Sequence, residues 1–477
     1  MPKDMRWDRN LSVAPDGESL IGHAGAVLLR KLADQCGLTA ALSRALARAG
    51  KFPLVDRGMA LVSMAVAIVL GATSMSDIAL LAHQELVFGP PPSDTTIRRT
   101  LELADDKTLR KIAKARARIR AHVWELITAT PSGFPWLTIA GKILTGWLVI
   151  DMDATLVTAC SDKEGAAPTF KKGFGFHPLG AWLANTTESL AMLLRPGNAG
   201  SNTVADHLTV LGEALAQVPA GWRSRLLVRV DGAGATHDLV RHLLSLSTRR
   251  RTVLFTCGWM ITEADEAAIR MLPRDAWQAA VDQDGKVQKG TAVAEITHLT
   301  SRAAGWPEGL RWIVRRTKPS RRQAGNLTAF EKATGWRYSV IVTNIPDTGI
   351  PDAAGSHHPQ FIDVLHREHA VVEDRVRTQK AMGLRNLPSK CWQVNRGWVL
   401  AACIAADLAA WCRLLGLYDQ DDLKDAEPDT LRYRLWHLPA RLTRHARKRM
   451  LRISATWPWK EAFIICWQRL RALPAST

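Results

Sequence analysis

The 477-residue sequence is long enough for roughly two to four domains. Its 47% hydrophobic and 23% charged residues are typical of a folded protein and exclude long disorder. Lys and Arg number 63 against 45 acidic residues, so the formal net charge is +18. This charge indicates a polyanionic partner such as nucleic acid, although a basic surface without a partner gives the same total.

The N-terminus and the cysteines indicate where the protein resides. The seven Cys are scattered without a CxxC pair, which excludes zinc ribbons and disulfide scaffolds and fits a reducing compartment. The first ten residues have mixed charge and no apolar core, so we expect no signal peptide and a cytoplasmic location. The longest apolar run, 58–72, is 15 residues and too short to span a membrane. We expect a buried helix there and no membrane partner.

Residues 1–140 have helical periodicity and predict a helical N-terminal DNA-binding domain. A short helix follows Ser93 or Asp94, either of which can serve as its cap, and carries Arg98 and Arg99. A helix start rich in hydroxyls and arginines suits contact with DNA phosphates, but solvated surface helices of this kind are equally common. The longer helices are expected over 24–47, 58–70, 76–87 and 106–127.

Two apolar runs end in acid and predict the first part of the core, 145–260. The run 147–155, WLVIDMDAT, contains Asp151 and Asp153, whose side chains leave the same face of a strand. The run 225–231, RLLVRVD, ends at Asp231. A single Asp at a strand end often only begins a turn. Repeated acids suggest instead a cation site at the end of a mixed α/β sheet. Further strands are expected at 188–194 and 253–257, and helices at 204–217 and 237–246.

Short strand-like runs characterise residues 261–345. We interpret this region as a mainly β insertion whose last strand could rejoin the core sheet. The predicted strands are 277–281, 293–298, 310–315 and 338–343.

The second part of the core, 346–418, contains a predicted amphipathic helix at 361–380. His366, His369, Glu373, Arg377 and Lys380 share one face of it on a 3.6-residue period. Alone, this face could be an exposed ion-paired surface. Together with two strand-end aspartates, one glutamate can complete a site for two divalent cations about 4 Å apart, the arrangement used in phosphoryl transfer. The neighbouring imidazoles and cations would then hold phosphates.

Residues 419–477 predict a basic helical C-terminal region. The stretch 431–460 contains no Asp or Glu, and its tryptophans are interleaved with cations. This combination suits phosphate neutralisation and base stacking, although the tryptophans could equally be packing anchors. The cations that we select for DNA contact are Arg441, Arg444, Arg447 and Lys448.

Three motifs in the chain resemble those of DDE transposases of bacterial insertion sequences, most closely the insertion-sequence 1380 group within the wider insertion-sequence 4 type. The first-acid motif DxT matches Asp153-Ala154-Thr155, and the second acid matches Asp231 in VRVDGAG. The third-acid signature Y-(2)-R-(3)-E-(6)-K matches at Glu373 and Lys380, with His366 at the Tyr position and His369 at the Arg position. The segment HPLGAWLANTTESLAMLLRPGNAGSNT is also similar to this group.

The resemblance implies an α/β fold with an RNase H-like catalytic core. Asp153, Asp231 and Glu373 would be catalytic residues and ligands of two Mg²⁺ or Mn²⁺ ions, with Asp151 as a possible additional ligand. The implied partners are double-stranded DNA, as element ends and target, and a second copy in a homodimer. Two alternatives stay open: a DNA-binding protein of transposase descent that no longer cuts, and an RNase H-like nuclease without strand transfer.

Overall fold

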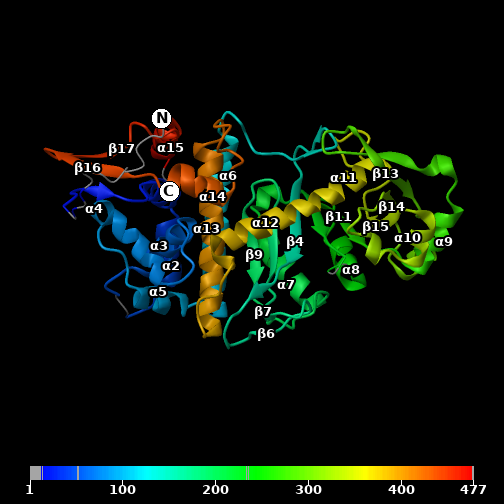
Figure 1. Cartoon of the computed structure of the whole chain (residues 1–477), viewed down its shortest axis with the longest axis horizontal. Helices are drawn as coiled ribbons and strands as arrows, with labels where there is room; N and C mark the ends of the chain where they lie inside the picture. Colours follow the sequence, from blue (N-terminus) through cyan, green and yellow to red (C-terminus); the bar gives the residue numbers. More distant parts are fainter. Residues whose placement is uncertain are drawn as a thin grey trace, which may run out of the picture.

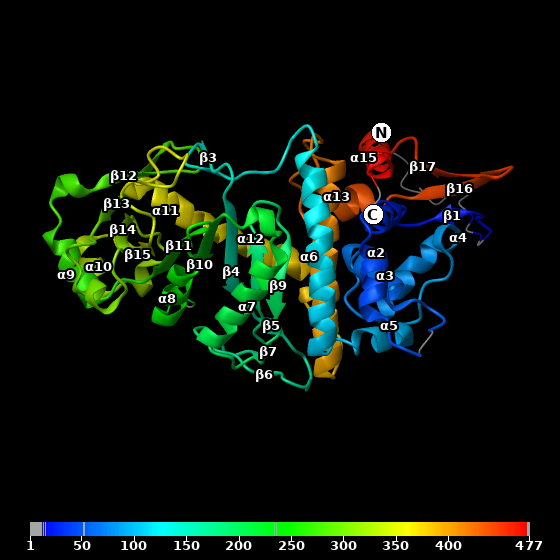
Figure 2. The same cartoon turned by 180° about the vertical axis from the view of Figure 1, so that it is seen from behind.

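The molecule is elongated, with a large sheet on one side and a helical part on the other (Figure 1). The computed structural model describes residues 12, 14, 16–50, 53–232, 234 and 236–474. Two long helices, α6 (Asp106–Thr128) and α13 (Trp392–Gly416), stand side by side between the two parts, as both views show (Figures 1 and 2). Because α13 is long and apolar enough to cross a membrane yet 83% buried, it is the central core helix of this fold.

The helical part contains most of the predicted N-terminal helices. The prediction of one helix over 24–47 is wrong, because Gly37 adopts a left-handed φ of 80° between two helices. The expected helix 76–87 is mainly a 3₁₀ helix followed by one short α-turn. The helix after Ser93 is confirmed, and Ser93 caps it by accepting a hydrogen bond from the Thr96 amide at 3.2 Å. These elements are α1 (Ala26–Gln35), α2 (Leu38–Leu46), α3 (Arg57–Val69), η1 (Ser76–Gln84), α4 (Glu85–Phe88) and α5 (Asp94–Leu101).

The C-terminal segment returns to the helical part and corrects one expectation. Residues 440–453 form the antiparallel hairpin β16 (Ala440–His445) and β17 (Lys448–Ile453), where we predicted helix. Strand β1 (Leu20–Ile21) pairs with β16, so the two ends of the described chain share one sheet. The helix that follows, α15 (Lys460–Ala472), packs against α1 and α13. Before the hairpin lie α14 (Pro428–Leu431) and the π-helical turn η8 (Arg432–Trp436).

The large sheet has nine strands in the order β12-β13-β14-β15-β11-β10-β4-β8-β9. Three predicted strands are confirmed as its parallel centre: β4 (Leu148–Ala154), β10 (Arg225–Val230) and β11 (Thr252–Trp259). Strands β8 (Leu179–Leu183) and β9 (Ser189–Leu193) continue it as an antiparallel meander. We did not predict β8, whose five residues are all buried and therefore show no alternation.

All four strands of the expected insertion extend this same sheet, not only the last. Strand β15 pairs antiparallel with β11, and β14, β13 and β12 follow outward. The strands are β12 (Gln278–Val281), β13 (Val287–Glu295), β14 (Arg311–Thr317) and β15 (Arg337–Thr343). Helices α9 (Glu263–Met271) and α10 (Ala329–Thr334) also belong to this region, and neither was predicted.

The two faces of the sheet have different coverings. Leu148, Ile150 and Met152 of β4 share a core with α7 (Val204–Gln217) and α8 (His237–Ser245). Trp147 and Val149 instead share a core with α11 (Pro359–Arg367). Because side chains alternate along a strand, Asp151 and Asp153 point to the α11 face. The predicted helix 361–380 lies on this face, but it is interrupted by a 3₁₀ turn (Glu368–Ala370) before α12 (Val371–Gln379) and ends in a π-helical turn at Lys380–Leu384.

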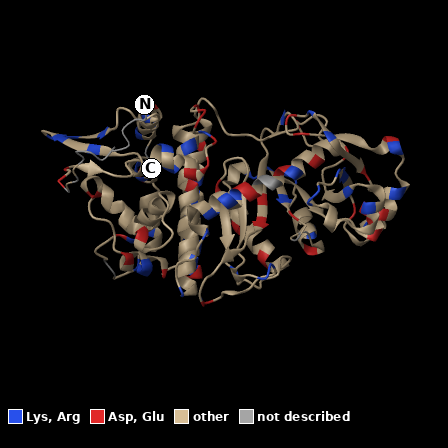
Figure 3. Ribbon diagram, in the orientation of Figure 1, with Lys and Arg blue, Asp and Glu red and all other residues tan. Residues whose placement is uncertain are grey.

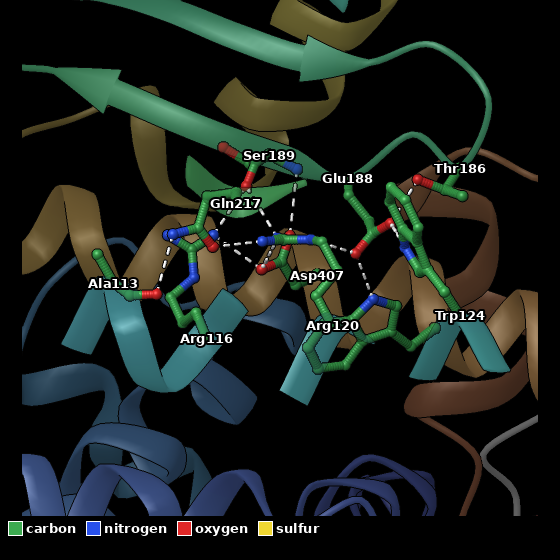
Figure 4. Close-up of polar contacts among 10 residues, drawn as sticks. Ala113, Arg116, Arg120, Trp124, Thr186, Glu188, Ser189, Gln217 and Asp407 are labelled. Atoms are coloured by element: carbon green, nitrogen blue, oxygen red, sulfur yellow. Dashed lines mark hydrogen bonds and ion pairs between the residues drawn. The ribbon is translucent and has the colours of Figure 1, made fainter. Parts of the chain in front are cut away.

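A buried charge network joins α6, β9 and α13 (Figure 4). Arg120 of α6 donates to Glu188 at 2.7 Å and to Asp407 of α13 at 2.8 Å. Arg116 donates to Asp407 at 2.8 Å, and the Trp411 indole donates to Glu188 at 2.6 Å. All four charged side chains are almost fully buried, so each compensates the desolvation of the others. The network therefore connects the edge of the sheet at β9 to the long helices α6 and α13.

Candidate active site

The first two predicted acids lie at the same level of adjacent parallel strands. Asp153 is the penultimate residue of β4, and Asp231 directly follows β10. Met152 is paired with Val230 in the parallel register, so each acid stands one residue beyond that pair. The Asp231 carboxylate accepts a hydrogen bond from the Gly234 amide at 3.2 Å, which turns the chain away from the strand. The strand ends thus bring these two carboxylates to one edge of the sheet, as predicted.

The electrostatics of Asp153 show that it has acidic neighbours. Burial raises its pKa, and the negative charges of Asp231 and Glu373 raise it further, while His369 and a hydrogen bond from the Ala154 amide oppose the rise. The result is a pKa of about 6. Repulsion of this kind arises only between carboxylates that lie close together. Asp153, Asp231 and Glu373 therefore form one electrostatic group.

Glu373 reaches the group from α12, which packs beside β4. Its side chain is exposed, in contrast to the partly buried Asp153. Acidic and basic segments of the ribbon meet where α12 crosses the end of β4 (Figure 3). Val372, next to Glu373, is buried, so α12 turns one side to the protein interior.

The donor set fits divalent cations, because hard ions such as Mg²⁺ prefer carboxylate oxygens. A bound cation would also relieve the repulsion that raises the pKa of Asp153. Within residues 16–50, 53–232 and 236–474, however, no three His, Cys, Asp or Glu side chains converge into a closed ligand cage. The three acids lie around an open edge of the sheet, and Glu373 is the most exposed of them.

Asp151 is committed to an ion pair and is not placed as a ligand. Its two oxygens accept hydrogen bonds from Arg229 Nε at 2.6 Å and Nη2 at 2.8 Å, and Oδ1 also contacts His369 Nδ1 at 3.1 Å. Burial raises the pKa of Asp151, but Arg229 and the hydrogen bond from His369 outweigh burial and hold the pKa at about 2. A signal for this pair exists in the sequence, since Arg229 interrupts an apolar strand and such a buried charge needs a partner.

The two histidines of the predicted phosphate-binding face lie in the interior. His366 packs over Gly258 of β11, and its Nδ1 contacts the Thr256 hydroxyl at 3.1 Å. Burial, with the charges of His369 and Arg229, lowers the pKa of His366 to about 3. His366 is therefore a neutral packing residue, and its expected phosphate contact is not supported. Gly258 is the feature of the sequence that allows His366 to pack there, because a side chain at this position would collide with the ring.

His369 occupies a different position, beside Asp153. Its Nδ1 is held by Asp151, and its Nε2 is buried without a hydrogen-bond partner in the described part of the chain. Its charge lowers the pKa of Asp153, so the two side chains are close. A buried ring nitrogen without a partner next to Asp153 is suited to contact a bound phosphate or water.

Of the predicted cations on the helix, Lys380 lies near the acids and Arg377 does not. Burial and the charges of Lys171 and Arg385 lower the pKa of Lys380, while Asp153 raises it. Lys380 thus has Lys171 and Arg385 as cationic neighbours as well as Asp153, and no pattern in the sequence indicated Lys171 or Arg385. Arg377 is exposed and pairs with Asp374 at 2.8 Å and Glu427 at 2.7 Å.

The remaining predicted DNA-binding cations lie far from this group along the fold. Arg98 and Arg99 are exposed on α5 in the helical part. The cations selected in the C-terminal region are exposed on the β16–β17 hairpin or its turn: Arg441, Arg444, Arg447 and Lys448.

Two histidines that we did not predict lie close to Asp231. The Asp231 charge raises the pKa values of His177 and His207, but burial outweighs it and lowers both. His207 of α7 also touches Gly234, where a β-carbon would approach its Nε2 to 2.7 Å. Neither position has a spacing relation to Asp231 in the sequence, so only the fold brings them together.

An acid cluster at the end of a mixed α/β sheet is the class of site that binds divalent cations for phosphoryl transfer. Comparison with known proteins gives the family. The family model described as "Transposase DDE domain group 1" matches residues 4–475. The chain therefore belongs to the DDE transposases of this group.

Curated relatives and solved structures add little to this assignment. Uncharacterized proteins of Mycobacterium bovis and Mycobacterium tuberculosis are each 31% identical over 121 residues, which is 24% of this chain. The match spans 37% of the length of those relatives. A structure of the piggyBac transposase synaptic complex with hairpin DNA covers 90% of this chain and 80% of its own, at 11% identity and a TM-score of 0.40.

Proposed function

We propose that this transposase cuts DNA at the ends of its insertion sequence and joins them to a new site, using Asp153, Asp231 and Glu373. The observation that supports this most strongly is that β4, β10 and α12 bring the three acids of the family motif into one electrostatic group. Two divalent cations bound there would activate the attacking oxygen and stabilise the leaving oxygen.

The proposed core is RNase H-like. Three strands in antiparallel meander, β4, β8 and β9, followed by two strands parallel to the first, β10 and β11, support this assignment. The order places both strand-end acids at the centre of the sheet, where a ligand can approach between the carboxyl ends. The insertion strands lengthen the sheet without covering that edge.

The other residues of the site bind and orient the DNA backbone. Lys380 provides positive charge near Asp153, and together with its cationic neighbours Lys171 and Arg385 it would hold the phosphates that flank the reacting one. The Asp151–Arg229 pair positions His369, whose Nε2 is buried without a hydrogen-bond partner among the described residues. Asp151 is thus a positioning residue in this proposal, not a ligand.

Three finer assignments belong to the proposal. The motifs favour the insertion-sequence 1380 group, and by that similarity the DNA bound is the terminal inverted repeat. Two ends must be joined in one reaction, so we propose a homodimer in the DNA complex. Activity on the element's own DNA also requires a cytoplasmic location in a bacterial cell.

A cleavage assay separates this proposal from its alternatives. The substrate is a labelled duplex that carries the end of the element, incubated with Mg²⁺ and a target plasmid. We expect wild type to cut and to transfer the strand, and Asp231→Asn to bind equally but cut at least a hundredfold more slowly. Cutting without strand transfer would favour the nuclease. Binding without cutting by wild type, in Mg²⁺ or Mn²⁺, would favour the inactive DNA-binding protein.

A further inference from the structure

The β16–β17 hairpin projects from the end of the molecule opposite the large sheet (Figures 1 and 2). Its base is anchored by β1, which pairs with Ala440 and Arg441 of β16. Nearer the turn, the Arg449 guanidinium lies 3.4 Å from the carbonyl oxygens of Leu86 and Val87 in α4. The hairpin is therefore held at its base and again near its turn, while its outer face stays exposed or half-buried.

The two faces of the hairpin have opposite character. The inner face carries Leu442, Leu451 and Ile453, which pack on the core of the helical part. The outer face carries three cross-strand pairs, all exposed or half-buried. These pairs are Arg441 with Arg452, Thr443 with Met450, and His445 with Lys448.

The hairpin carries like charges directly opposite each other on both of its faces. Arg441 is opposed to Arg452 on the outer face, and Arg444 is opposed to Arg449 on the inner face nearer the turn. Like charges in such pairs destabilise a sheet. Among the described residues, none of the six hairpin cations Arg441, Arg444, Arg447, Lys448, Arg449 and Arg452 forms an ion pair. The ribbon of the hairpin has blue segments for Lys and Arg and no red segment for Asp or Glu (Figure 3). A polyanionic partner would offset this repulsion.

We propose that the hairpin is a DNA-reading ribbon that lies in the major groove of duplex DNA, with its outer face against the base edges. The major groove admits a two-stranded β-ribbon, and arginine can donate two hydrogen bonds to guanine O6 and N7. Thr443 and Met450, between the charged pairs, provide the short polar and apolar contacts that distinguish bases. Arg444 and Arg447 at the tip reach the flanking phosphates. The inference rests on the proposed function, since it names the element that recognises the DNA to be cut.

The test uses the full chain, a labelled element-end duplex and an unrelated duplex of equal length. Binding is followed by fluorescence anisotropy, and groove occupancy by methylation protection of guanine N7, which faces the major groove. The variants are Arg441→Gln/Arg452→Gln and the charge-retaining Arg441→Lys/Arg452→Lys. The control, Arg241→Gln/Lys424→Gln, removes two exposed cations elsewhere, each already paired with a nearby Asp.

If the hairpin binds in the major groove, the three variants should differ in their affinity for the two duplexes. The glutamine variant should bind the element end roughly a hundredfold more weakly, since each bidentate arginine contributes about tenfold or more, and should lose a patch of N7 protection. The lysine variant should retain affinity for the unrelated duplex but lose most preference for the element end, because lysine lacks the bidentate fork. The control should resemble wild type. The melting temperature of the glutamine variant should be equal to or above that of wild type, because a like-charge pair is removed. The lysine variant keeps both charges and should melt as wild type does, and the control should melt at most slightly lower because its two ion pairs are exposed.

Three other outcomes would overturn the inference, and each would point to a different role for the hairpin. If the glutamine variant binds and protects as wild type does, the hairpin does not contact DNA, while the proposed function stands if the ends are still cut. If the lysine variant keeps full preference, the hairpin contacts phosphates only. If wild type binds vesicles containing phosphatidylserine but neither duplex, the surface is a lipid-binding one and the proposed function fails as well.

Discussion

At the scale of single residues, two aspartates that are two positions apart have opposite environments. Asp151 is ionised by its pair with Arg229, whereas the pKa of Asp153 is raised to about 6 by burial and by the nearby Asp231 and Glu373. The Asp151 carboxylate is thus stabilised by its ion pair, whereas the Asp153 carboxylate is repelled by its acidic neighbours. Repulsion between acids of the second kind is relieved by a proton or by a bound cation, and acids with raised pKa values are frequent at functional sites.

Replacing each aspartate should separate these roles. Asp151→Asn leaves Arg229 buried without a counter-charge, so we expect a loss of about 3–5 kcal/mol in the free energy of unfolding. Asp153→Asn removes a repelled carboxylate and should leave stability unchanged or slightly higher at pH 7. Urea unfolding followed by tryptophan fluorescence measures both. Equal destabilisation by the two variants would contradict the assigned roles.

The sequence patterns indicated the positions of the acids more closely than the contacts of the residues around them. Strand ends and helical periodicity indicated where Asp151, Asp153, Asp231 and Glu373 emerge, and the DxT motif of the resembling family then favoured Asp153 over Asp151. Helical periodicity places His366 and His369 on one helix face. It does not indicate that His366 packs against Gly258 or that His369 contacts Asp151, because these contacts depend on the neighbouring strands. Lys171 and Arg385 approach Lys380 only through long-range folding.

At the scale of elements, the joint between α6, β9 and α13 connects the sheet to the helical part. Glu188 accepts hydrogen bonds from Arg120 and from the indoles of Trp124 and Trp411, all fully buried. The joint determines how the edge of the sheet is held relative to the long helices. No single segment of sequence indicates it, because its partners lie in three distant elements.

Glu188→Gln keeps the shape of the side chain but removes its charge. The buried Arg120 then retains only Asp407 as a counter-ion, and we expect a loss of about 3–5 kcal/mol in the free energy of unfolding. The matched control is Arg241→Gln, which breaks an exposed pair with Asp238 and should cost less than about 0.5 kcal/mol. Chemical unfolding compares the two. A cost for Glu188→Gln as small as that of the control would show that the network is not a structural joint.

Element prediction succeeded where an apolar run or a helical period was clearly bounded. The parallel strands β4, β10 and β11 were located as apolar runs, two of which end in acid, and the helices α6 and α7 by their period. Strand β8, which is also buried on both faces, lies in a run with Gly180 and no acid at its end, and it was missed. The hairpin β16–β17 was predicted as helix, because its composition of arginine, leucine and alanine also suits helices. Pairing with β1, far away in sequence, decides its structure.

At the scale of the whole molecule, binding and cutting of DNA are expected to involve different regions. The excess of +18 charges favours DNA over a broad surface, whereas the acids occupy one sheet edge. Chelating divalent ions should therefore abolish cutting but leave binding of the element end within about threefold of its value, since phosphate contacts from Lys and Arg do not require the metal. Cleavage and anisotropy assays with EDTA, then with Mg²⁺ restored, measure this. Cutting that persists in EDTA would contradict a metal site.

The central claim is that the three acids of the sheet edge and α12 act together in cutting. The most direct measurement is single-turnover cleavage of the element end in Mg²⁺ by Glu373→Gln and by Asp374→Asn. The two residues are adjacent and exposed on α12, but Glu373 contributes to the raised pKa of Asp153, whereas Asp374 pairs with Arg377. We predict that Glu373→Gln cuts at least a hundredfold more slowly and that Asp374→Asn cuts as wild type does. Equal rates for wild type and Glu373→Gln would contradict the account.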